Sequence, residues 1–552
     1  MIPRWAVALG TGALLAALLS YPTVVSPGSM TRFETGDGRF SNWNVAWVAH
    51  ALINDPRHLF DANIFHPHRG ALAFSEANLV AGALGVPIYA LTANPVATHN
   101  LVIYQALVLA FVTMWALVRR LTGADAPALV SATAFTFAPF VAARTAHVQL
   151  LMVFVFPVTL IAWHRFVDAP GLWRGAVLGA ALALAALSCG YYGVYAGLAV
   201  GFAALWFAVG QPRLVRYGVG LLMAVVVVVG VVGPVLRPYL VLRSESGARR
   251  QINVEELRGY SADARAYLTS PSHAHQWIRR AVGTGREVLF PGAIVTVLAL
   301  AAFGRTRGAA AASSPASAPR RRALPIQGFY LCLAMLAAWA SFGPDAGLYT
   351  LLNQLLPFMS FLRAPARFGI LVVFALAVLA GFGVTRLTAR RGRTLVSAVL
   401  VALIAVEVSA APWPLRRVPP VPEAYRRLRD LPRGAVVDFH FAYRRDSLFA
   451  HTRAMFWSMW HWQPLVNGYS DFIPPDFDSI RVPINGFPDE PSFRIMEERQ
   501  VRYVVVNLGD YQGDARPRLL AKFPQYQPHL RLLVDRDDVQ LYEIVSYPAP
   551  RR

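Results

Sequence analysis

Residues 214–236 read LVRYGVGLLMAVVVVVGVVGPVL, an apolar stretch in which Arg216 is the only charged residue. Its length matches the about 20 residues that a helix needs to cross roughly 30 Å of hydrocarbon. The whole 552-residue sequence follows the same trend, with 55% hydrophobic and 15% charged residues and a mean hydropathy of +0.42. Soluble domains carry about 25% charged residues, so this composition predicts a polytopic membrane protein.

Other apolar stretches of similar length predict about eleven membrane-spanning helices in total. The first follows Arg4 and runs from Trp5 to Val25. Because it is longer than a signal-peptide core and no clear cleavage site follows, we expect it to be retained. The expected spans are 6–25, 98–118, 125–142, 148–166, 174–189, 191–209, 214–236, 288–304, 326–342, 369–387 and 394–411.

The positions of the arginines predict the orientation of these spans. If the N-terminus is cytoplasmic, every even-numbered connection is cytoplasmic and every one of them is basic, as the positive-inside rule requires. The chain is therefore expected to lie in a bacterial inner membrane, with an Ala/Ser/Pro-rich cytoplasmic linker over 305–325. The arginines of these connections include Arg119, Arg120, Arg165, Arg174, Arg213, Arg216, Arg305, Arg322, Arg386 and Arg393.

Long connections fall on the opposite, periplasmic face, at 26–97, 237–287 and 343–368. The apolar segment 79–91 lies within the first of them. Counting it as a span would place every later basic connection outside, so we interpret it as an interfacial helix. The spans and these connections form an expected transmembrane domain over 1–411.

Beyond Pro412 the charge rises and the apolar runs shorten. Residues 436–439 and 501–506 have the composition of strands, and 531–544 is typical of a hairpin that turns at Arg536-Asp537-Asp538. We therefore predict an all-α polytopic membrane protein with a small α/β C-terminal periplasmic domain over 412–552.

The net charge of +21 comes from 52 basic and 31 acidic residues, and Lys522 is the only lysine. Positive-inside connections account for this balance, and no nucleic-acid-binding motif is present, so no nucleic-acid partner is expected. Cys189 and Cys332 both lie in apolar spans, which argues against a disulfide framework and against a cysteine metal site.

The first outer connection contains Thr35-Gly36-Asp37-Gly38-Arg39 directly after the first span. The two glycines give the backbone freedom to aim Asp37, and a carboxylate near a membrane surface is able to act as a general base. The alternative is a capping role at a helix that begins near Ser41. Arg39 is a further candidate for substrate binding.

Two other groups of this connection are ionisable. Glu76 precedes the interfacial helix and is a candidate for substrate binding, or alternatively interacts with the helix dipole. His66 and His68 lie too close together to form a metal site without a third ligand, which favours a structural role.

Two short outer turns carry polar side chains between apolar spans. Arg144 and His147 lie in the first, where ionisable groups usually face a cavity or a partner, although arginine also extends to the interface. Tyr191 and Tyr192 lie in the second, where they belong to an aromatic belt or stack on a sugar. All four are candidate substrate-binding residues.

Arg363 and Arg367 lie in the sequence LRAPARF over 362–368, on the outer side, where arginine is normally sparse. If this segment is helical, residues four apart share one face. Guanidinium groups are suited to binding phosphate oxygens, although interface anchoring is the simpler role. We expect both to face the same cavity as Asp37.

These features resemble the GT-C membrane glycosyltransferases, such as the aminoarabinose lipid A transferase and the protein O-mannosyltransferases. The similarity covers roughly residues 1–240, and 74–123 follows the family's arrangement closely. In that family the acidic residue of the first outer loop is the proposed base, which Asp37 matches. The motifs LRAPARF and NGYS, at 467–470, are shared with uncharacterised bacterial membrane proteins of this class.

The sequence also departs from the family. His147 stands where many members have Asp, and the paired Asp-Glu of the O-mannosyltransferases is absent. No counterpart is found near Glu76 for a lysine that binds lipid phosphate in some members. If the resemblance holds, phosphate binding falls to arginines, with Arg144, Arg363 and Arg367 as the candidates.

The resemblance implies transfer of a sugar from a polyprenyl-phosphate donor to a glycan, lipid or protein acceptor, with inversion at the anomeric carbon. Membrane lipid is the other expected partner. No cofactor is expected, and the sequence supports no divalent-metal site. The alternatives are a lipid-linked glycan transporter or flippase, and a non-catalytic membrane assembly protein. Transporters often show inverted repeats, and no internal repeat is detectable here.

Overall fold

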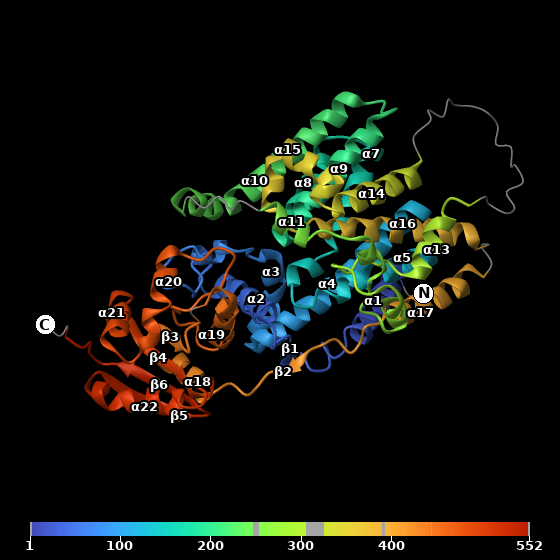
Figure 1. Cartoon of the computed structure of the whole chain (residues 1–552). Helices are drawn as coiled ribbons and strands as arrows, with labels where there is room; N and C mark the ends of the chain where they lie inside the picture. Colours follow the sequence, from blue (N-terminus) through green and yellow to red (C-terminus); the bar gives the residue numbers. More distant parts are fainter. Residues whose placement is uncertain (1–2, 247–252, 305–324, 389–391, 443, 550–552) are drawn as a thin grey trace, which may run out of the picture. The chain divides into compact units, whose positions relative to one another are not determined.

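The computed structural model describes residues 3–246, 253–304, 325–388, 392–442 and 444–549 (Figure 1). The chain divides into two compact units. Unit 1 comprises 1–25, 101–237 and 249–413, and unit 2 comprises 26–100, 238–248 and 414–552. The expected linker over 305–325 lies outside the described residues, apart from Pro325.

Unit 1 is a helical bundle whose central helix is α16. It packs against α5, α13 and α14. Gly383 allows the close approach of α13, because a side chain there would collide with the carbonyl group of Leu298. The helices of unit 1 are α1 Arg4–Leu19, α5 Asp125–Thr136, α6 Pro139–Ala142, α7 Val155–Asp168, α8 Leu172–Ser188, α9 Gly190–Ala208, α11 Val254–Gly259, α12 Gln276–Val282, α13 Ala293–Ala301, α14 Ile326–Ser341, α15 Leu348–Leu355, α16 Gly369–Leu387 and α17 Arg393–Val408.

Each of the eleven expected spans contains a helix, and their apolar character is that of a multi-pass membrane protein. Among the described residues, five helical segments are long and apolar enough to cross a membrane, so a count of about eleven is not confirmed. The unit boundaries fall within two of them, α4 (Pro95–Thr122) and α10 (Leu214–Ser246). The five segments are Pro95–Thr122, Asp125–Ala142, Gly190–Ala208, Leu214–Ser244 and Pro365–Leu387.

In two expected spans the α-helix begins several residues later than predicted. Within 148–166, a 3-10 helix over Val148–Leu151 ends before α7 begins at Val155. Pro157 then lies in the first turn of α7, where its missing N–H costs no helical hydrogen bond. Within 288–304, only Ala293–Ala301 is α-helical, because Pro291 is followed by Gly292 at φ 102°, a conformation that ends a regular helix.

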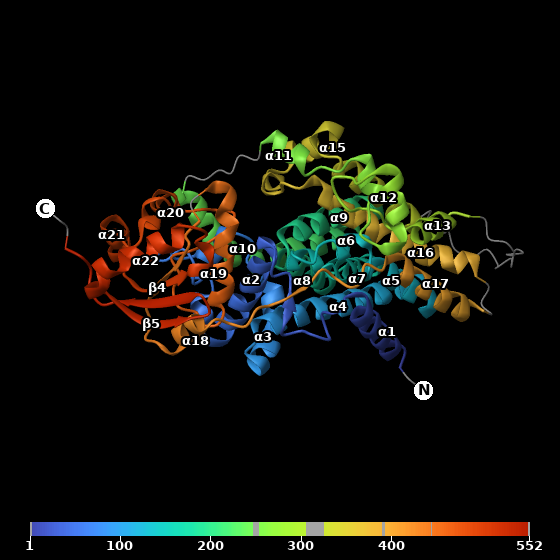
Figure 2. The same cartoon turned by 60° about the horizontal axis from the view of Figure 1, so that its bottom comes forward.

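Unit 2 contains a four-stranded sheet in the order β3-β4-β6-β5, labelled in the orange-to-red part of the chain in Figure 1, with β4 and β5 also labelled in Figure 2. β3 (Ala435–Phe439) runs parallel to β4 (Val501–Asn507), and β6 (Val539–Ile544) is antiparallel to β4 and to β5 (Leu530–Arg536). The predicted strands and hairpin are confirmed. Asp537 and Asp538 form the turn at φ 59° and 56°, the left-handed conformation of a two-residue hairpin loop.

The first outer connection belongs to the same hydrophobic core as this sheet. Trp43 and Phe65 pack in one cluster with Phe456, Phe477 and Val504. A two-stranded pair, β1 (Met30–Thr31) with β2 (Arg416–Arg417), also joins the two parts of the chain. The helices of unit 2 are α2 Gly36–Asn54, α3 Leu79–Thr92, α18 Glu423–Asp430, α19 His451–Ser458, α20 Pro475–Ile480, α21 Glu490–Glu498 and α22 Ala515–Tyr526.

Candidate functional site

The predicted site residues fall into two groups, one in each unit. Arg144, His147, Tyr191, Tyr192, Arg363 and Arg367 belong to unit 1, and Asp37, Arg39 and Glu76 belong to unit 2. Each group is described by itself.

Unit 1 brings Arg363 and Arg367 together around one tyrosine. The guanidinium carbon of Arg367 lies 4.4 Å from the ring centroid of Tyr191, and the backbone N–H of Arg363 donates to the Tyr191 hydroxyl at 3.0 Å. The guanidinium carbon of Arg363 lies 5.9 Å from the ring of Tyr260. We name Tyr191, Tyr260, Arg363 and Arg367 the arginine–tyrosine cluster.

The spacing of the two arginines is not that of an α-helix. A 3-10 helix covers Pro365–Phe368, and the preceding Ala364 is not helical, with φ −121° and ψ 84°, because the residue before a proline disfavours the helical conformation. The backbone N–H of Ala366 donates to the carbonyl of Tyr260 at 3.1 Å. The segment is therefore not α-helical, so the four-residue spacing does not place the two arginines on one helix face, and Tyr191 and Tyr260 position them instead.

Ring packing beneath the cluster holds this segment in place. The ring of Phe368 lies 4.2 Å from that of Tyr195 on α9, centroid to centroid. The hydroxyl of Tyr349 on α15 donates to the carbonyl of Leu362. LRAPARF is thus fixed to α9, α15 and the residue after α11, which explains how two arginines at these positions acquire defined orientations.

The other unit 1 candidates, Arg144, His147 and Tyr192, lie in positions where they stabilise the helix packing. Arg144 forms an ion pair with Glu287, and its guanidinium lies 5.0 Å from the ring of Phe140. His147 directly precedes the 3-10 helix over Val148–Leu151. Tyr192 is fully buried and donates to the carbonyl of Leu150 at 2.6 Å, so it joins α9 to this turn and offers no exposed ring face.

Asp37 lies in the first turn of α2 in unit 2. The helix begins at Gly36, and the Thr35 hydroxyl accepts the hydrogen bond of the Gly38 N–H at 3.1 Å. Thr35 is therefore the capping residue, and the alternative role for Asp37 as cap of a helix starting near Ser41 is wrong. The half-buried Asp37 carboxylate lies at the positive end of a helix dipole, where a negative charge is favoured.

The two glycines beside Asp37 serve close packing rather than an unusual backbone conformation. A Cβ atom at Gly36 would collide with the ring of Phe449, and one at Gly38 would collide with the carbonyl group of Arg32. Both glycines lie within helix α2. The motif thus lets the start of the helix approach the chain before it and the residues before α19.

Arg39 and Glu76 also lie in unit 2. Arg39 donates to the hydroxyl of Thr452 at 2.9 Å and to the carbonyl of Phe33 at 2.8 Å. Partial burial, followed by the nearby charge of Arg453, lowers the pKa of Arg39. Glu76 precedes α3 by three positions, and its backbone carbonyl accepts from Asn44 on α2 at 3.0 Å. The structure thus connects Arg39 to the C-terminal part of unit 2.

Sequence reasoning missed a buried polar group at the carboxyl ends of β3 and β4. Asp438 accepts hydrogen bonds from Tyr425 at 2.8 Å and from Asn507 at 2.7 Å. Burial raises the pKa of the Asp438 carboxyl to about 7. Asn467 of the NGYS motif bonds both the N–H and the carbonyl of Asp438, each at 2.8 Å. Only the pairing of strands far apart in sequence reveals this group.

The histidines of the first outer connection have structural partners, as their spacing favoured. The Nε2 atom of His68 lies 2.8 Å from the carboxylate of Asp476, which also accepts from Arg499 at 2.6 Å. The other Arg499 nitrogen donates to the carbonyl of His66. Within the described residues, no group of three His, Cys, Asp or Glu side chains is arranged to hold a metal ion.

This arrangement of helices and sheet is similar to the fold of a solved membrane glycosyltransferase. The arabinofuranosyltransferase AftD from Mycobacteria is similar over 99% of this chain, with a TM-score of 0.56 and 14% sequence identity. A second structure of AftD gives a TM-score of 0.58 and 15% identity. The chain spans about two fifths of the length of AftD, with 40% of that protein covered.

Two other glycosyltransferase structures match with lower scores. The archaeal oligosaccharyltransferase AglB from Archaeoglobus fulgidus has a TM-score of 0.46 at 12% identity, covering 96% of this chain and 72% of AglB. ArnT from Cupriavidus metallidurans has a TM-score of 0.41 at 13% identity, covering 99% of both chains. No family model matches the sequence, and no curated protein matches it.

Proposed function

We propose that this chain is a membrane glycosyltransferase that transfers a sugar from a polyprenyl-phosphate donor to an acceptor hydroxyl on the periplasmic face. The observation that carries the proposal is the fold shared with AftD, a glycosyltransferase, over nearly the whole chain. This likeness favours transfer over a transporter or a non-catalytic assembly protein, because the fold of a known transferase accounts for both the membrane helices and the C-terminal sheet.

In the proposed reaction Asp37 is the general base. It takes the proton of the acceptor hydroxyl while that oxygen attacks the anomeric carbon of the donor sugar. The bond between this carbon and the phosphate oxygen breaks, and its electron pair leaves with the polyprenyl phosphate. A direct displacement of this kind inverts the configuration at the anomeric carbon.

The arginine–tyrosine cluster supplies the proposed binding groups for the lipid phosphate. The leaving phosphate gains negative charge as the bond breaks, and fixed cationic donors stabilise that charge most strongly where water is excluded. Arg363 and Arg367 are candidates for these donors because tyrosine rings already orient their guanidinium groups. Arg144 is a weaker candidate, since Glu287 already neutralises it.

A deletion strain tests the proposal most directly. Intact-lipid mass spectrometry of the strain and its parent should show a lost glycan or glycolipid, together with an accumulated polyprenyl-phosphate sugar. Complementation with the wild-type chain should restore the product, and Asp37→Asn should not. Asp55→Asn is a matched control, because Asp55 follows the other end of the same helix and contacts the exposed His58. Unchanged lipids and glycans in the deletion strain would contradict the proposal.

The shared core of unit 2 supports the proposed orientation. Residues 26–100 and 414–552 pack in one hydrophobic cluster, so an even number of membrane crossings must separate them. The expected spans between them, from 98–118 to 394–411, are even in number. Reporter fusions at positions 315 and 480 should give opposite signals, and matching signals would contradict the proposed topology.

A further inference from the structure

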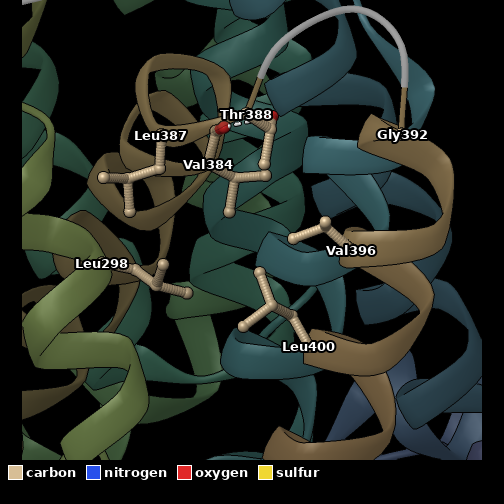
Figure 3. A pocket seen from close by; sticks show the side chains of 7 residues that line it. All are labelled: Leu298, Val384, Leu387, Thr388, Gly392, Val396 and Leu400. Atoms are coloured by element: carbon tan, nitrogen blue, oxygen red, sulfur yellow. Dashed lines mark hydrogen bonds between the residues drawn. The ribbon is translucent and has the colours of Figure 1, made fainter. Parts of the chain in front are cut away.

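A hollow of about 320 Å³ lies among α13, α16 and α17 in unit 1. Its wall is formed by Leu298 of α13, Val384 and Leu387 of α16, and Val396 and Leu400 of α17 (Figure 3). The volume is at the lower end of the roughly 300–1,000 Å³ range of small-molecule sites. Leu387 is 63% exposed and Val396 is 43% exposed, so apolar side chains of this wall reach the surface of the bundle.

The hollow has a polar end and an apolar end. Thr388 and Gly392 lie at the end where α16 stops and α17 begins, whereas Leu298 and Leu400 lie further along the helices (Figure 3). From Gly392 to Leu400 the helix axis advances about 12 Å at 1.5 Å per residue. This shape suits a narrow, flexible apolar chain that carries a polar group at one end.

Two arginines lie in the helix turns next to the polar end, Arg386 in the last turn of α16 and Arg393 at the start of α17. Arg393 donates to the Thr388 hydroxyl at 3.1 Å and to the Thr388 carbonyl at 2.9 Å. Arg386, which is exposed, donates to the carbonyl of Gly304 beyond the end of α13 at 2.7 Å. Across the described part of the chain neither guanidinium forms an ion pair with a carboxylate. Both therefore keep their positive charge uncompensated and have donors left for an anion.

We propose that the hollow binds one membrane phospholipid with an anionic headgroup. One acyl chain occupies the apolar end, and the phosphate contacts Arg386 and Arg393. Of the three helices, α16 is long and apolar enough to cross a membrane, and α13 and α17 lie in expected spans. Helices that cross a membrane present such a hollow to acyl chains rather than to water-soluble ligands. Basic pockets between membrane helices bind anionic headgroups for the same electrostatic reason. This site is separate from the arginine–tyrosine cluster and does not depend on the proposed transferase activity.

The test is native mass spectrometry of the full chain in mild detergent, titrated separately with phosphatidylglycerol and phosphatidylcholine. We expect the first phosphatidylglycerol to bind at least about fivefold more tightly than phosphatidylcholine, since one arginine near a headgroup contributes roughly that factor. Arg386→Gln and Arg393→Gln together should remove most of this preference. Val396→Trp should fill the hollow and weaken the binding of both lipids.

Two variants of α10 are the matched controls. Arg216→Gln removes an exposed arginine, and Val219→Trp enlarges a surface side chain that is 44% exposed; both should leave lipid binding unchanged. Equal binding of the two lipids by the parent, or unchanged binding by the protein that carries both Arg386→Gln and Arg393→Gln, would overturn the proposal and leave ordinary surrounding lipid only. The result for this double variant alone decides the proposal if Val396→Trp does not fold.

Discussion

The two units place their charged groups in different ways. In unit 1, Arg363 and Arg367 are oriented by the rings of Tyr191, in the first turn of α9, and of Tyr260, directly after α11. In unit 2, Asp37 lies on a helix whose neighbours come from the far end of the chain, as the Arg39–Thr452 hydrogen bond shows. The orientation of the two arginines therefore depends on aromatic packing. The position of the Asp37 carboxylate depends on the assembly of a unit built from distant parts of the chain.

The largest effect is expected at Asp37. Asp37→Asn preserves the shape of the side chain and removes the base, so we expect transfer to fall by roughly 100-fold or more. Because Thr35 caps α2, the variant should fold normally. Transfer of a labelled sugar from a synthetic polyprenyl-phosphate donor measures the effect, with Asp55→Asn as the control. If the Asp37→Asn enzyme is active, Asp37 is not the general base.

Substitutions of Arg367 test whether the arginine–tyrosine cluster of unit 1 binds lipid phosphate. Arg367→Ala should lower turnover by roughly 100-fold, because one donor to the developing charge is lost. Arg367→Lys keeps the charge without the planar fork and should cost about tenfold. Binding of undecorated polyprenyl phosphate should weaken in the alanine variant. If both variants bind this lipid like the parent, the phosphate-binding role is wrong.

Substitutions of Tyr191 test the orientation of the two arginines without changing their charge. Tyr191→Leu removes the ring below Arg367, and the loss of this cation–π contact should lower turnover by about five- to tenfold. Tyr191→Phe keeps the ring and removes only the acceptor of the Arg363 N–H, so a smaller loss is expected. Measuring both with the same donor shows which contact orients the cluster, and equal activity of all three proteins would show that neither does.

The buried Asp438 of unit 2 should make its sheet sensitive to pH. Its pKa is raised by burial to about 7, above the about 3.9 of an unfolded aspartate. The contribution of protonated Asp438 to the free energy of unfolding is therefore complete below about pH 4. It decreases as the pH rises from about 4 and is lost as the pH passes through 7. Hydrogen exchange of peptides covering β3 and β4 should accelerate over this range by up to about tenfold per pH unit, beyond the intrinsic exchange rate.

Asp438→Asn is the matched variant for this measurement. It has no titrating carboxyl at this position, so the additional pH dependence of β3 and β4 should disappear. Peptides from α16 in unit 1 provide an internal reference, because they contain no equivalent group. If the parent and the variant show the same pH dependence, Asp438 does not carry the effect.

Much of the fold could be predicted because the signals are local. Apolar runs locate the helices, strand composition and the Asp537-Asp538 turn locate the sheet, and arginine counts favour an orientation. The boundaries of α7 and α13 were less accurate, since Pro157 and the Pro291-Gly292 pair act on the backbone inside otherwise apolar runs. The membership of residues 26–100 in unit 2 has no local signal.

The candidate site was predictable as a set of residues and not as an arrangement. An unusual position relative to the membrane singles out Asp37, Arg363 and Arg367. Their supports are not visible in the same way: Tyr260 is one aromatic residue among many, and Asp438 lies in an ordinary strand. For Tyr192 the sequence suggested a ring exposed at a membrane turn, whereas the structure buries this side chain completely in the helix packing.

Unit 2 is built from the first and the last parts of the chain, and this imposes a delay during synthesis. Residues 26–100 leave the ribosome roughly three hundred residues before 414–552, with which they share a core. At about 5–20 residues per second, this segment waits roughly 15–60 s for its packing partners. During that time Trp43 and Phe65 lack the side chains that later bury them. We therefore expect chaperones or membrane lipid to cover these apolar side chains until synthesis is complete.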